Sequence, residues 1–498
     1  MEKDYILSID QSTQGTKALL FDSRGSLVCR SDIPHRQMIN EEGWVSHNLD
    51  EIYENTIQVV KNAVRESGID KNRIAGLGIS NQRETSAMWE RGSGKPLADA
   101  IVWQCSRAKD ICAAIEKQGK AEEIRRATGI NLSPYFPASK FAWLLQNVDG
   151  AKERARGGEL CLGTVDSFLV YRLTGGKAFK TDYSNASRTQ LFNISQLTWD
   201  EGICRIFGIP MDALAEVCDS NSCFGETDFD GYLEQPIPIH GVLGDSHGAL
   251  FGQGCLERGM IKTTYGTGSS IMMNIGDAPV ISTHGVVTSL AWGLDGKVNY
   301  VLEGNINYTG AVITWLKDDL NLIQSAAETE ILARSANPDD TAYLVPAFTG
   351  IGAPYWDSGA TAVISGITRK TRKAEIVRAG LECIAYQIAD IVNAMSQDAG
   401  IPIEELRVDG GPTRNQYLMQ FQSDILGIRV LVPDAEELSG IGAAYAAGLA
   451  LGIYDKSIFS RMKRKGFGPE MNADVREKKY AGWKAAVGKA LGAADRIS

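Results

Sequence analysis

The N-terminal end of the chain alternates short apolar runs with polar turns. The apolar runs are Tyr5–Ile9, Lys17–Phe21 and Ser26–Cys29, and the turns between them are Gln11–Gly15 and Asp22–Gly25. Short apolar runs punctuated by glycine and polar residues are typical of strands joined by hairpin turns. The pattern therefore predicts that the chain opens with three consecutive strands.

The next segment changes to a helical period. Asp50–Ser67 places Ile52, Ile57 and Val60 on one side of a helix, and a short apolar run, Ile74–Ile79, follows it. An order of several antiparallel strands, then a helix and another strand, favours a mixed sheet covered by helices. We therefore expect an α/β fold.

A second opening of the same kind appears in the middle of the chain. Met260–Tyr265 leads into the hydroxyl- and glycine-rich turn Gly266–Ser270 and then into Ile271–Asn274. Similar patterns predict strands at Val286–Trp292 and Val298–Leu302, and helices at Tyr308–Leu320 and Ala374–Ser396. We expect two architecturally related halves, residues 1–250 and 251–498, without a sequence repeat.

Composition agrees with a globular chain of more than one domain. The chain has 498 residues, of which 44% are hydrophobic and 22% are charged, as is ordinary for such proteins. Its net charge of −10 argues against a nucleic-acid partner, because neutralising phosphates needs clustered Lys and Arg. We interpret the acidity as an aid to solubility.

The cysteines and the apolar segments indicate a cytoplasmic protein. The nine cysteines show no CxxC spacing, and the closest pair, Cys218 and Cys223, has no histidines at zinc-finger spacing. We expect free thiols in a reducing compartment. The N-terminus lacks the apolar stretch of a signal peptide, and the apolar run Gly440–Ile453 is too short to span a membrane.

The first candidate phosphate site is Asp10–Lys17, directly after a predicted strand. The Asp10 carboxylate can hold magnesium through water, and the hydroxyls and backbone amides of the turn, including Thr13, can bind phosphate oxygens. Lys17 would neutralise phosphate charge. The alternative interpretation of this segment is an ordinary polar hairpin.

Two further turns carry similar chemistry. In Tyr265–Ser270, small residues such as Gly266 let the backbone approach a phosphate, and hydroxyls add donors. In Val408–Asn415, the glycines would let an adenosine lie against the backbone, with Asn415 as a polar contact. Taken alone, the first is also explained by a tight glycine turn and the second by a strand-to-helix turn.

The order and spacing of these three segments resemble the actin-like ATPase superfamily. The common alternatives are missing, since the sequence has no GxxxxGK[ST] loop, no HRD or DFG motif, and no GxGxxG opening a helix after the first strand. The resemblance implies a two-domain actin-like (ribonuclease H-like) fold, with a nucleotide bound in the cleft between the domains.

The substrate side narrows the resemblance to one family. Tyr135–Asn147 and Ala362–Glu382 are similar to the two signatures of the FGGY carbohydrate kinases. Within that family the resemblance is closest to the glycerol kinases, and it covers nearly the whole chain. Matching segments include Asn81–Thr85, Ile101–Cys105 and Thr181–Arg188. The resemblance implies ATP-dependent phosphorylation of a terminal hydroxyl of a small polyol or sugar.

The resemblance also implies roles for individual positions. Arg83, Glu84 and Tyr135 would bind substrate hydroxyls, and Trp103 would form an apolar wall. Asp245 would act as the general base and, with Asp10, would hold Mg²⁺. The residues that would contact ATP are Thr13, Lys17, Gly266, Thr267, Gly310, Gly411 and Asn415. A base in this position typically contributes about 10²–10⁴-fold to the rate.

Two departures from the glycerol kinases concern the substrate pocket. Ser246, followed by His247, stands where those enzymes usually have Gln, and Ser270 stands where they usually have Phe. Both changes remove volume and leave hydroxyls that a short substrate would not satisfy. Glycerol is the leading single substrate, and tetritols, pentitols and ketoses are the alternatives. A non-catalytic nucleotide switch on the same fold is a further alternative, and we expect a homo-oligomer, a dimer or a tetramer.

Overall fold

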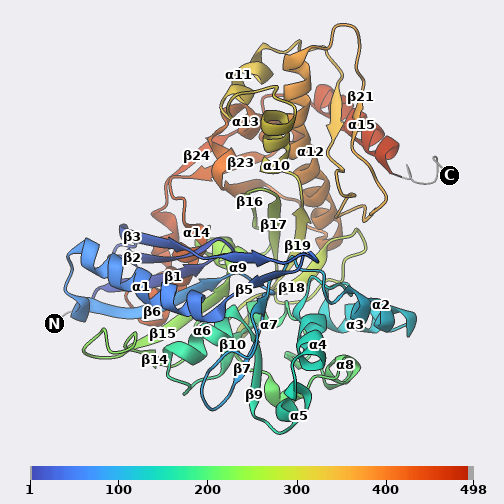
Figure 1. Ribbon diagram of the computed structural model, residues 1–498. Helices are drawn as coiled ribbons and strands as arrows, with labels where there is room; N and C mark the ends of the chain where they lie inside the picture. The colour runs from blue at the N-terminus through green and yellow to red at the C-terminus, as the bar shows by residue number, and fades with distance from the viewer. Residues whose placement is uncertain (1–2, 492–498) are drawn as a thin grey trace.

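Each half of the chain is built around one large mixed β-sheet, and the C-terminal half stands above the N-terminal half in Figure 1. The computed structural model describes residues 3–491. This architecture confirms the predicted α/β fold with two related parts.

The N-terminal sheet has six strands, with β1 near its centre. In spatial order the strands are β14 (Glu226–Thr227), β15 (Ile237–Gly244), β6 (Ile74–Asn81), β1 (Tyr5–Gln11), β2 (Gly15–Phe21) and β3 (Leu27–Pro34). β1, β2 and β3 pair antiparallel, whereas β6 is parallel to both β1 and β15. The three opening strands and the mixed sheet predicted from the sequence are confirmed.

The C-terminal sheet has seven strands and opens in the same way. In spatial order the strands are β18 (Val287–Leu294), β19 (Lys297–Ile306), β17 (Ser269–Gly276), β16 (Ile261–Tyr265), β22 (Glu405–Asp409), β23 (Arg429–Pro433) and β24 (Arg464–Phe467). β16 pairs antiparallel with β17 and parallel with β22, as β1 does with β2 and β6. The two halves therefore present equivalent hairpins.

Smaller sheets and helices complete the fold. The smaller strands are β4 (Gln37–Ile39), β5 (Val45–His47), β7 (Ser86–Glu90), β8 (Ala100–Ile101), β9 (Leu160–Thr164), β10 (Lys180–Asp182), β11 (Phe192–Asn193), β12 (Thr198–Trp199), β13 (Glu216–Cys218), β20 (Tyr343–Val345) and β21 (Val363–Ser365). The α-helices are α1 (Leu49–Ser67), α2 (Lys109–Lys117), α3 (Ala121–Thr128), α4 (Pro137–Asn147), α5 (Ala151–Arg156), α6 (Val165–Leu173), α7 (Tyr183–Ala186), α8 (Glu201–Phe207), α9 (Asp245–Gly252), α10 (Gly310–Thr314), α11 (Glu328–Ser335), α12 (Lys373–Ala399), α13 (Gln416–Leu426), α14 (Leu438–Ala450) and α15 (Ala473–Ala490).

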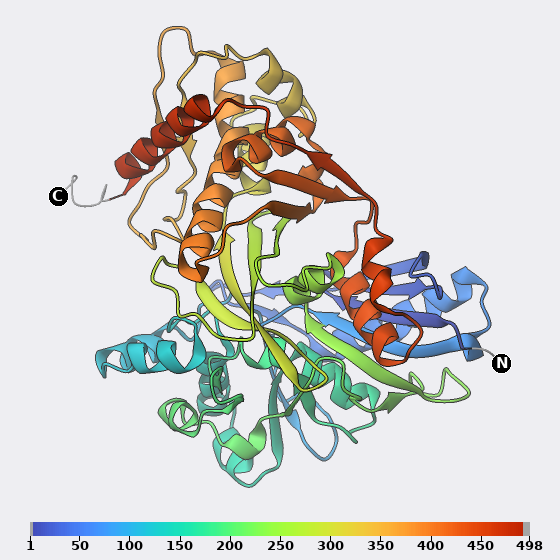
Figure 2. The same cartoon turned by 180° about the vertical axis from the view of Figure 1, so that it is seen from behind.

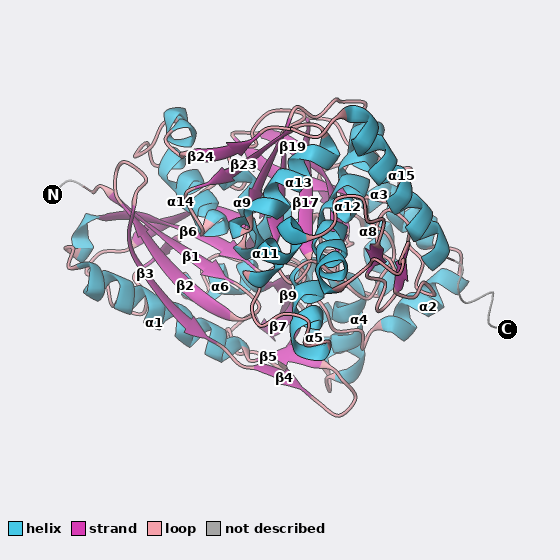
Figure 3. Cartoon of the chain, turned by 90° about the horizontal axis from the view of Figure 1, so that it is seen from above, coloured by secondary structure: helices cyan, strands magenta, loops and turns pink. Residues whose placement is uncertain are grey.

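Helix α1 shows how local sequence sets an element. Its N-cap, Asn48, accepts a hydrogen bond from the Glu51 amide, and Gly68 ends the helix with φ 69°. Its apolar side, including Ile52 and Val60, is buried against β2 and β3, and Figure 3 shows the helix running along these strands. The predicted amphipathic helix is confirmed.

The predicted helix at Tyr308–Leu320 takes a different form. The chain forms the short helix α10 and then a π-helical turn, Trp315–Asp319. The predicted long helix Ala374–Ser396 is confirmed as α12. The wide turn after α10 lies beside the cavity described below, since Lys317 and Asp318 line that cavity.

Helix α14 belongs to the C-terminal part of the sequence but packs on the N-terminal sheet. It contacts β1, β6, β15 and helix α9, and Figure 2 shows it beside those strands. The approach requires glycine, because a Cβ at Gly78 would lie 2.4 Å from the Ala443 carbonyl oxygen. The apolar run noted at Gly440–Ile453 is therefore largely a buried helix that joins the two halves.

Two features bear on the environment expected from the sequence. All nine cysteines are free thiols. Within residues 3–491, no helix combines the length and the apolar character needed to cross a membrane.

Candidate active site

The expected substrate-binding residues emerge from one edge of the N-terminal sheet. Strand β6 ends at Asn81, two residues before Arg83, and strand β15 ends at Gly244, immediately before Asp245. Asn81 and Gly244 are partners in the parallel pairing of β6 with β15. The carboxyl ends of adjacent parallel strands thus bring these side chains together, as is typical of ligand sites in α/β sheets.

Asp10 lies on the same edge, at the end of β1. It pairs with Ser80 of β6 and with Lys17 of β2. Its pKa is raised from 3.8 to about 6 because the carboxyl group is buried, and the nearby Lys17 ammonium only partly offsets this effect. Asp10 is therefore a buried carboxylate next to the first phosphate turn.

Lys17 already has carboxylate partners. Its ammonium group donates to Glu437 at 2.7 Å and lies 3.8 Å from Asp10. Arg30 also pairs with Glu437, which directly precedes α14. The cation expected to neutralise phosphate thus sits between carboxylates of the two halves.

The Arg83 guanidinium is held by three acidic or hydroxyl groups. It donates to both carboxylate oxygens of Glu303 at 2.9 Å and to the Ser246 hydroxyl at 3.2 Å. Its Nε atom lies 3.1 Å from an Asp245 oxygen, but the N–H is not aligned for a hydrogen bond. Arg83 and Asp245 are thus in contact at the centre of the candidate site.

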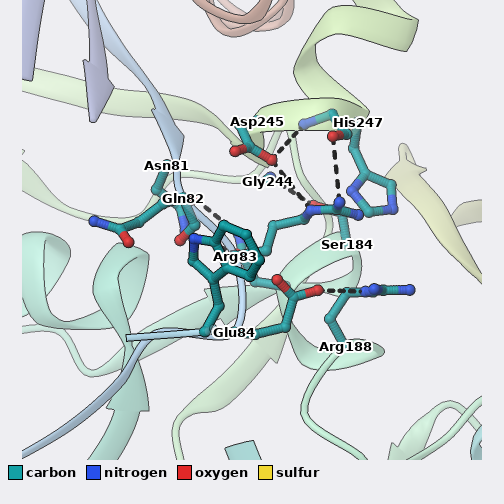
Figure 4. Close-up of polar contacts among 12 residues, drawn as sticks. Asn81, Gln82, Arg83, Glu84, Ser184, Arg188, Gly244, Asp245 and His247 are labelled. Carbon is teal, nitrogen blue, oxygen red and sulfur yellow. Dashed lines mark hydrogen bonds and ion pairs between the residues drawn. The ribbon is translucent and has the colours of Figure 1, made fainter. Parts of the chain in front are cut away.

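Glu84 has a separate partner, Arg188, whose Nε donates to it at 2.6 Å (Figure 4). Both side chains are almost fully buried. The backbone of Glu84 has φ 59°, a left-handed conformation that is costly for a residue with a side chain. The surrounding structure holds this strained conformation, which often marks functional sites.

Asp245 is the exposed carboxylate of the group. It begins α9, and 37% of its side chain is accessible. One of its oxygens accepts a hydrogen bond from the Ser246 amide at 2.6 Å. The remaining acceptor capacity can take a proton from a bound hydroxyl group.

Two aromatic side chains form the expected wall. The rings of Trp103 and Tyr135 lie 5.5 Å apart, and the Trp103 indole N–H donates to the Thr13 hydroxyl at 2.9 Å. This hydrogen bond links the substrate wall to the first phosphate turn. The ammonium group of Lys140 donates to the carbonyl oxygens of Trp103 at 3.2 Å and of Tyr135 at 2.5 Å, which fixes both backbones.

The residues that depart from the glycerol kinase pattern have different environments. The Ser246 hydroxyl accepts from Arg83, whereas the Ser270 hydroxyl is buried without a partner. His247 is fully buried, and burial, together with the nearby Arg83 charge, holds its pKa well below the usual value. We therefore treat His247 as a neutral structural residue.

Apart from Thr13 and Lys17, the expected nucleotide residues come from the C-terminal half. The turn at Gly266 and Thr267 is exposed and receives hydrogen bonds from the backbone: the amide of Gly310 donates to the carbonyl of Gly266 at 3.0 Å. Next to it is a cavity of about 490 Å³, lined by Gly310, Gly411 and Asn415 among others. Its volume is in the range typical of small-molecule sites.

Asn415 is anchored on both sides of its amide. Its oxygen accepts from the Leu418 backbone and caps α13, and its nitrogen donates to the Thr329 hydroxyl at 3.0 Å. The cavity wall at Asn415 is therefore rigid.

The carboxylates fit the coordination preferences of magnesium. In the part of the chain that the structure describes, no three His, Cys, Asp or Glu side chains cluster into a metal site. Mg²⁺ in kinases is usually held by one or two carboxylates, with waters and phosphate oxygens as the other ligands. Asp10 on β1 and Asp245 directly after β15, two strands on either side of β6 in the same sheet, match that description.

Three residues of the site were given no role from the sequence. They are Glu303, Arg188 and Lys140, all buried and all ionisable. Glu303 carries the one available signal, because it directly follows the apolar run Tyr300–Leu302 at the end of a predicted strand, where a buried charge must find a partner.

Comparisons with known proteins agree with this geometry. The chain matches the FGGY family of carbohydrate kinases, its N-terminal domain over residues 5–252 and its C-terminal domain over residues 261–451. It is 46% identical to the glycerol kinase of Natranaerobius thermophilus over 98% of this chain and 99% of that one. It is 48% identical to glycerol kinase 1 of Thermotoga maritima over the same shares.

A solved structure gives the same result. The crystal structure of Plasmodium falciparum glycerol kinase with ADP superposes with a TM-score of 0.93, at 36% identity, over 98% of this chain and 99% of that one. The two-domain fold and the site define a phosphotransferase that acts on an alcohol group. The chain belongs to the FGGY family of carbohydrate kinases.

Proposed function

We propose that this chain transfers the γ-phosphoryl group of ATP to a terminal hydroxyl of a small polyol, with glycerol as the first candidate. The observation that carries the proposal is the contact between Arg83 and the accessible carboxylate of Asp245, on the sheet edge that also holds Asp10. The glycerol kinases named above support the choice of substrate. Residues 1–250 would supply the substrate pocket and the phosphate turn after Asp10, and residues 251–498 would supply the phosphate turn at Gly266 and the adenosine site.

The residues have distinct roles in this reaction. Asp245 accepts the hydroxyl proton as the oxygen attacks the γ-phosphorus and the bond to the β-phosphate oxygen breaks, releasing ADP. Arg83 donates to substrate oxygens and Glu84 accepts from substrate hydroxyls. Trp103 and Tyr135 pack against the carbons.

The nucleotide is bound mainly by backbone and small side chains. Thr13, Gly266 and Thr267 would contact phosphates, while Gly310, Gly411 and Asn415 would contact the adenosine in the adjoining cavity. Lys17 would neutralise phosphate charge only after its ion pair with Glu437 opens. Magnesium, held by Asp10 and Asp245, would neutralise charge on the phosphate oxygens.

A coupled ADP assay with magnesium, ATP and glycerol tests the proposal. We expect glycerol-dependent ADP release in the parent protein. A panel of erythritol, the pentitols and common ketoses run beside glycerol identifies the acceptor. ATP hydrolysis that no polyol or sugar accelerates would instead support a nucleotide switch and contradict the proposal.

A second candidate is a four- or five-carbon polyol or ketose. It is favoured by one observation, the Ser270 hydroxyl, which is buried without a partner. An unsatisfied buried polar group costs about 1–3 kcal/mol, so a substrate hydroxyl that reached it would gain affinity. The Ser246 hydroxyl does not add to this argument, because Arg83 already donates to it. The double variant Ser246→Gln with Ser270→Phe would then shift preference towards glycerol.

We further infer that the protein acts in the cytosol as a homo-oligomer, a dimer or a tetramer. The free thiols are consistent with a reducing compartment. Light scattering after size-exclusion chromatography measures the assembly directly.

A further inference from the structure

Glu303 is a fully buried carboxylate in the middle of β19. It has no accessible surface, and its neighbours Val301 and Leu302 are apolar and equally buried. A carboxylate in such a place is retained only when it is paired and hydrogen-bonded. Its partners therefore indicate why it is there.

Those partners are the two arginines of the candidate site. Arg83 donates to both carboxylate oxygens at 2.9 Å, a two-pronged arrangement that fixes the plane of the guanidinium group. Arg188, which also holds Glu84, lies 2.9 Å from one of the same oxygens. One carboxylate thus orders both arginines, and through Arg188 it also orders Glu84.

The charges of this buried group balance. Arg83 and Arg188 face Glu84 and Glu303, so two positive groups meet two negative groups. Burial alone would raise the pKa of Glu303, but the neighbouring Arg188 and Arg83 charges hold it below its usual value. Glu303 is therefore ionised at any working pH.

Glu303 comes from the other half of the chain. Arg83, Glu84 and Arg188 belong to the N-terminal half, whereas β19 is a strand of the C-terminal sheet. β19 pairs with β17, whose first residue, Ser269, belongs to the glycine-rich turn Gly266–Ser270. The Asn305 amide of the same strand donates to Glu303 at 3.2 Å. The carboxylate therefore connects the substrate arginines to the sheet that carries the nucleotide turn.

We propose that Glu303 is a positioning residue that fixes Arg83 for substrate binding and keeps its guanidinium group from closing on Asp245. The proposal rests on the proposed function, in which Arg83 binds the polyol and Asp245 is the base. The Nε atom of Arg83 is already 3.1 Å from Asp245, without an aligned hydrogen bond. Without Glu303, that carboxylate is the nearest remaining acidic partner of Arg83, and pairing with it would occupy the base.

The Glu303→Gln variant keeps the shape of the side chain and removes its charge. We expect the KM for the polyol to rise at least about tenfold and kcat to fall, because each tenfold factor reflects the loss of one well-made charged hydrogen bond. The KM for ATP should stay within about twofold, since none of the nucleotide residues contacts Glu303. Glu303→Asp restores the charge at a shorter reach, so its polyol KM should rise only about threefold.

Glu382→Gln is the matched control. Glu382 is also buried, belongs to the same half and lies in an ion pair with Arg378, but its other partners, Tyr417 and Lys479, do not belong to the candidate substrate site. The Glu382→Gln variant should lower the stability of the protein without changing the polyol KM. A generic loss of stability would therefore affect both glutamine variants alike, whereas a positioning role affects only Glu303→Gln.

Side-chain NMR of ¹⁵N-arginine provides a readout that does not depend on activity. In the parent we expect slowly exchanging Nε–H signals for Arg83 and Arg188, assigned by Arg83→Lys and Arg188→Lys. Both signals should shift and exchange faster in Glu303→Gln, and shift to a smaller extent in Glu303→Asp. If Glu303→Gln does not fold, Glu303→Asp decides the matter by the same signals and by KM.

The possible outcomes separate the two proposals. Parental arginine signals and a parental polyol KM in a folded Glu303 variant would overturn the positioning role while leaving the kinase function intact. If the parent phosphorylates no polyol, the proposed function fails, and unchanged arginine signals would overturn the positioning role separately.

Discussion

The substrate side and the nucleotide side of the site are built in opposite ways. Around Arg83 and Glu84, charged groups are buried and paired with one another. Around Gly310 and Gly411, the wall of a cavity of about 490 Å³ combines glycines and apolar side chains with charged side chains that are partly exposed, such as Lys317 and Arg414. The difference indicates that the substrate side is preorganised, so single charge changes there should be severe. The nucleotide side should tolerate substitution better.

The largest effect is expected at Asp245. Asp245→Asn keeps the size of the side chain but cannot accept the substrate proton, so kcat should fall about 10²–10⁴-fold. The thermal unfolding temperature should stay near the parental value, because the side chain is partly exposed. The affinity for a nonhydrolysable ATP analogue, measured without magnesium, should also stay near the parental value. Steady-state kinetics and calorimetry measure both, and turnover within a few-fold of the parent would refute the assignment of the base.

At Asp10 we expect one substitution to increase stability and to decrease activity. Folding raises the pKa of Asp10 from 3.8 to about 6. The contribution of this group to the free energy of unfolding is therefore fully present below pH 3.8 and is lost as the pH rises through about 6. Asp10→Asn removes that penalty. At pH 8 the ligand-free variant should gain about 1–3 kcal/mol in free energy of unfolding, and the gain should vanish near pH 4.

The same Asp10→Asn variant should lose more than about tenfold in kcat/KM for Mg-ATP, since it removes a carboxylate from the expected magnesium site. Urea unfolding at pH 4 and pH 8, together with kinetics at varied magnesium, measures both effects. A variant that is less stable at pH 8, or that uses Mg-ATP normally, would contradict this account of Asp10.

A moderate effect is expected where the two sides meet. Trp103→Phe keeps an aromatic wall but removes the N–H that donates to Thr13 at 2.9 Å. Because a neutral hydrogen bond contributes about 1 kcal/mol, both the polyol and the ATP KM should rise about fivefold. Thr13→Val should give a similar change, and the double variant should add little to either single one. Fully additive effects in this cycle would show that the hydrogen bond does not couple the two sites.

The smallest effect is expected on the nucleotide side. Thr329→Val removes the hydroxyl that accepts from the Asn415 amide, while the other side of that amide still caps α13. The KM for ATP should rise no more than about threefold, and the KM for the polyol should not change. A loss as large as that expected for Glu303→Gln would remove the contrast between the two sides.

Much of the fold could be predicted because it depends on local patterns. The hairpin strands around Asp10 and Gly266 and the helix Asp50–Ser67 follow from short-range hydrophobic periods, and all are present in the structure. The helix predicted over Tyr308–Leu320 differed in form, because its second part widens into a π-helical turn that no residue pattern distinguishes from an α-helix.

The site was predictable in its parts but not in its partners. Sequence motifs identified Arg83 and Lys17 as candidate site residues, but not their carboxylate partners. Glu303, which pairs with Arg83, lies 220 residues further along the chain, and Glu437, which pairs with Lys17, lies 420 residues further. Sequence patterns report which side chains are charged, whereas a buried ion pair depends on which strands the fold brings together.

The central claim is the transfer of a phosphoryl group from ATP to a polyol. The most direct measurement is ³¹P NMR of a reaction containing the protein, magnesium, ATP and glycerol, with Asp245→Asn as the control. The account predicts a phosphomonoester signal that grows in step with ADP in the parent and is absent in the control. ADP with only inorganic phosphate, for glycerol and for each longer polyol and ketose tested, would contradict it.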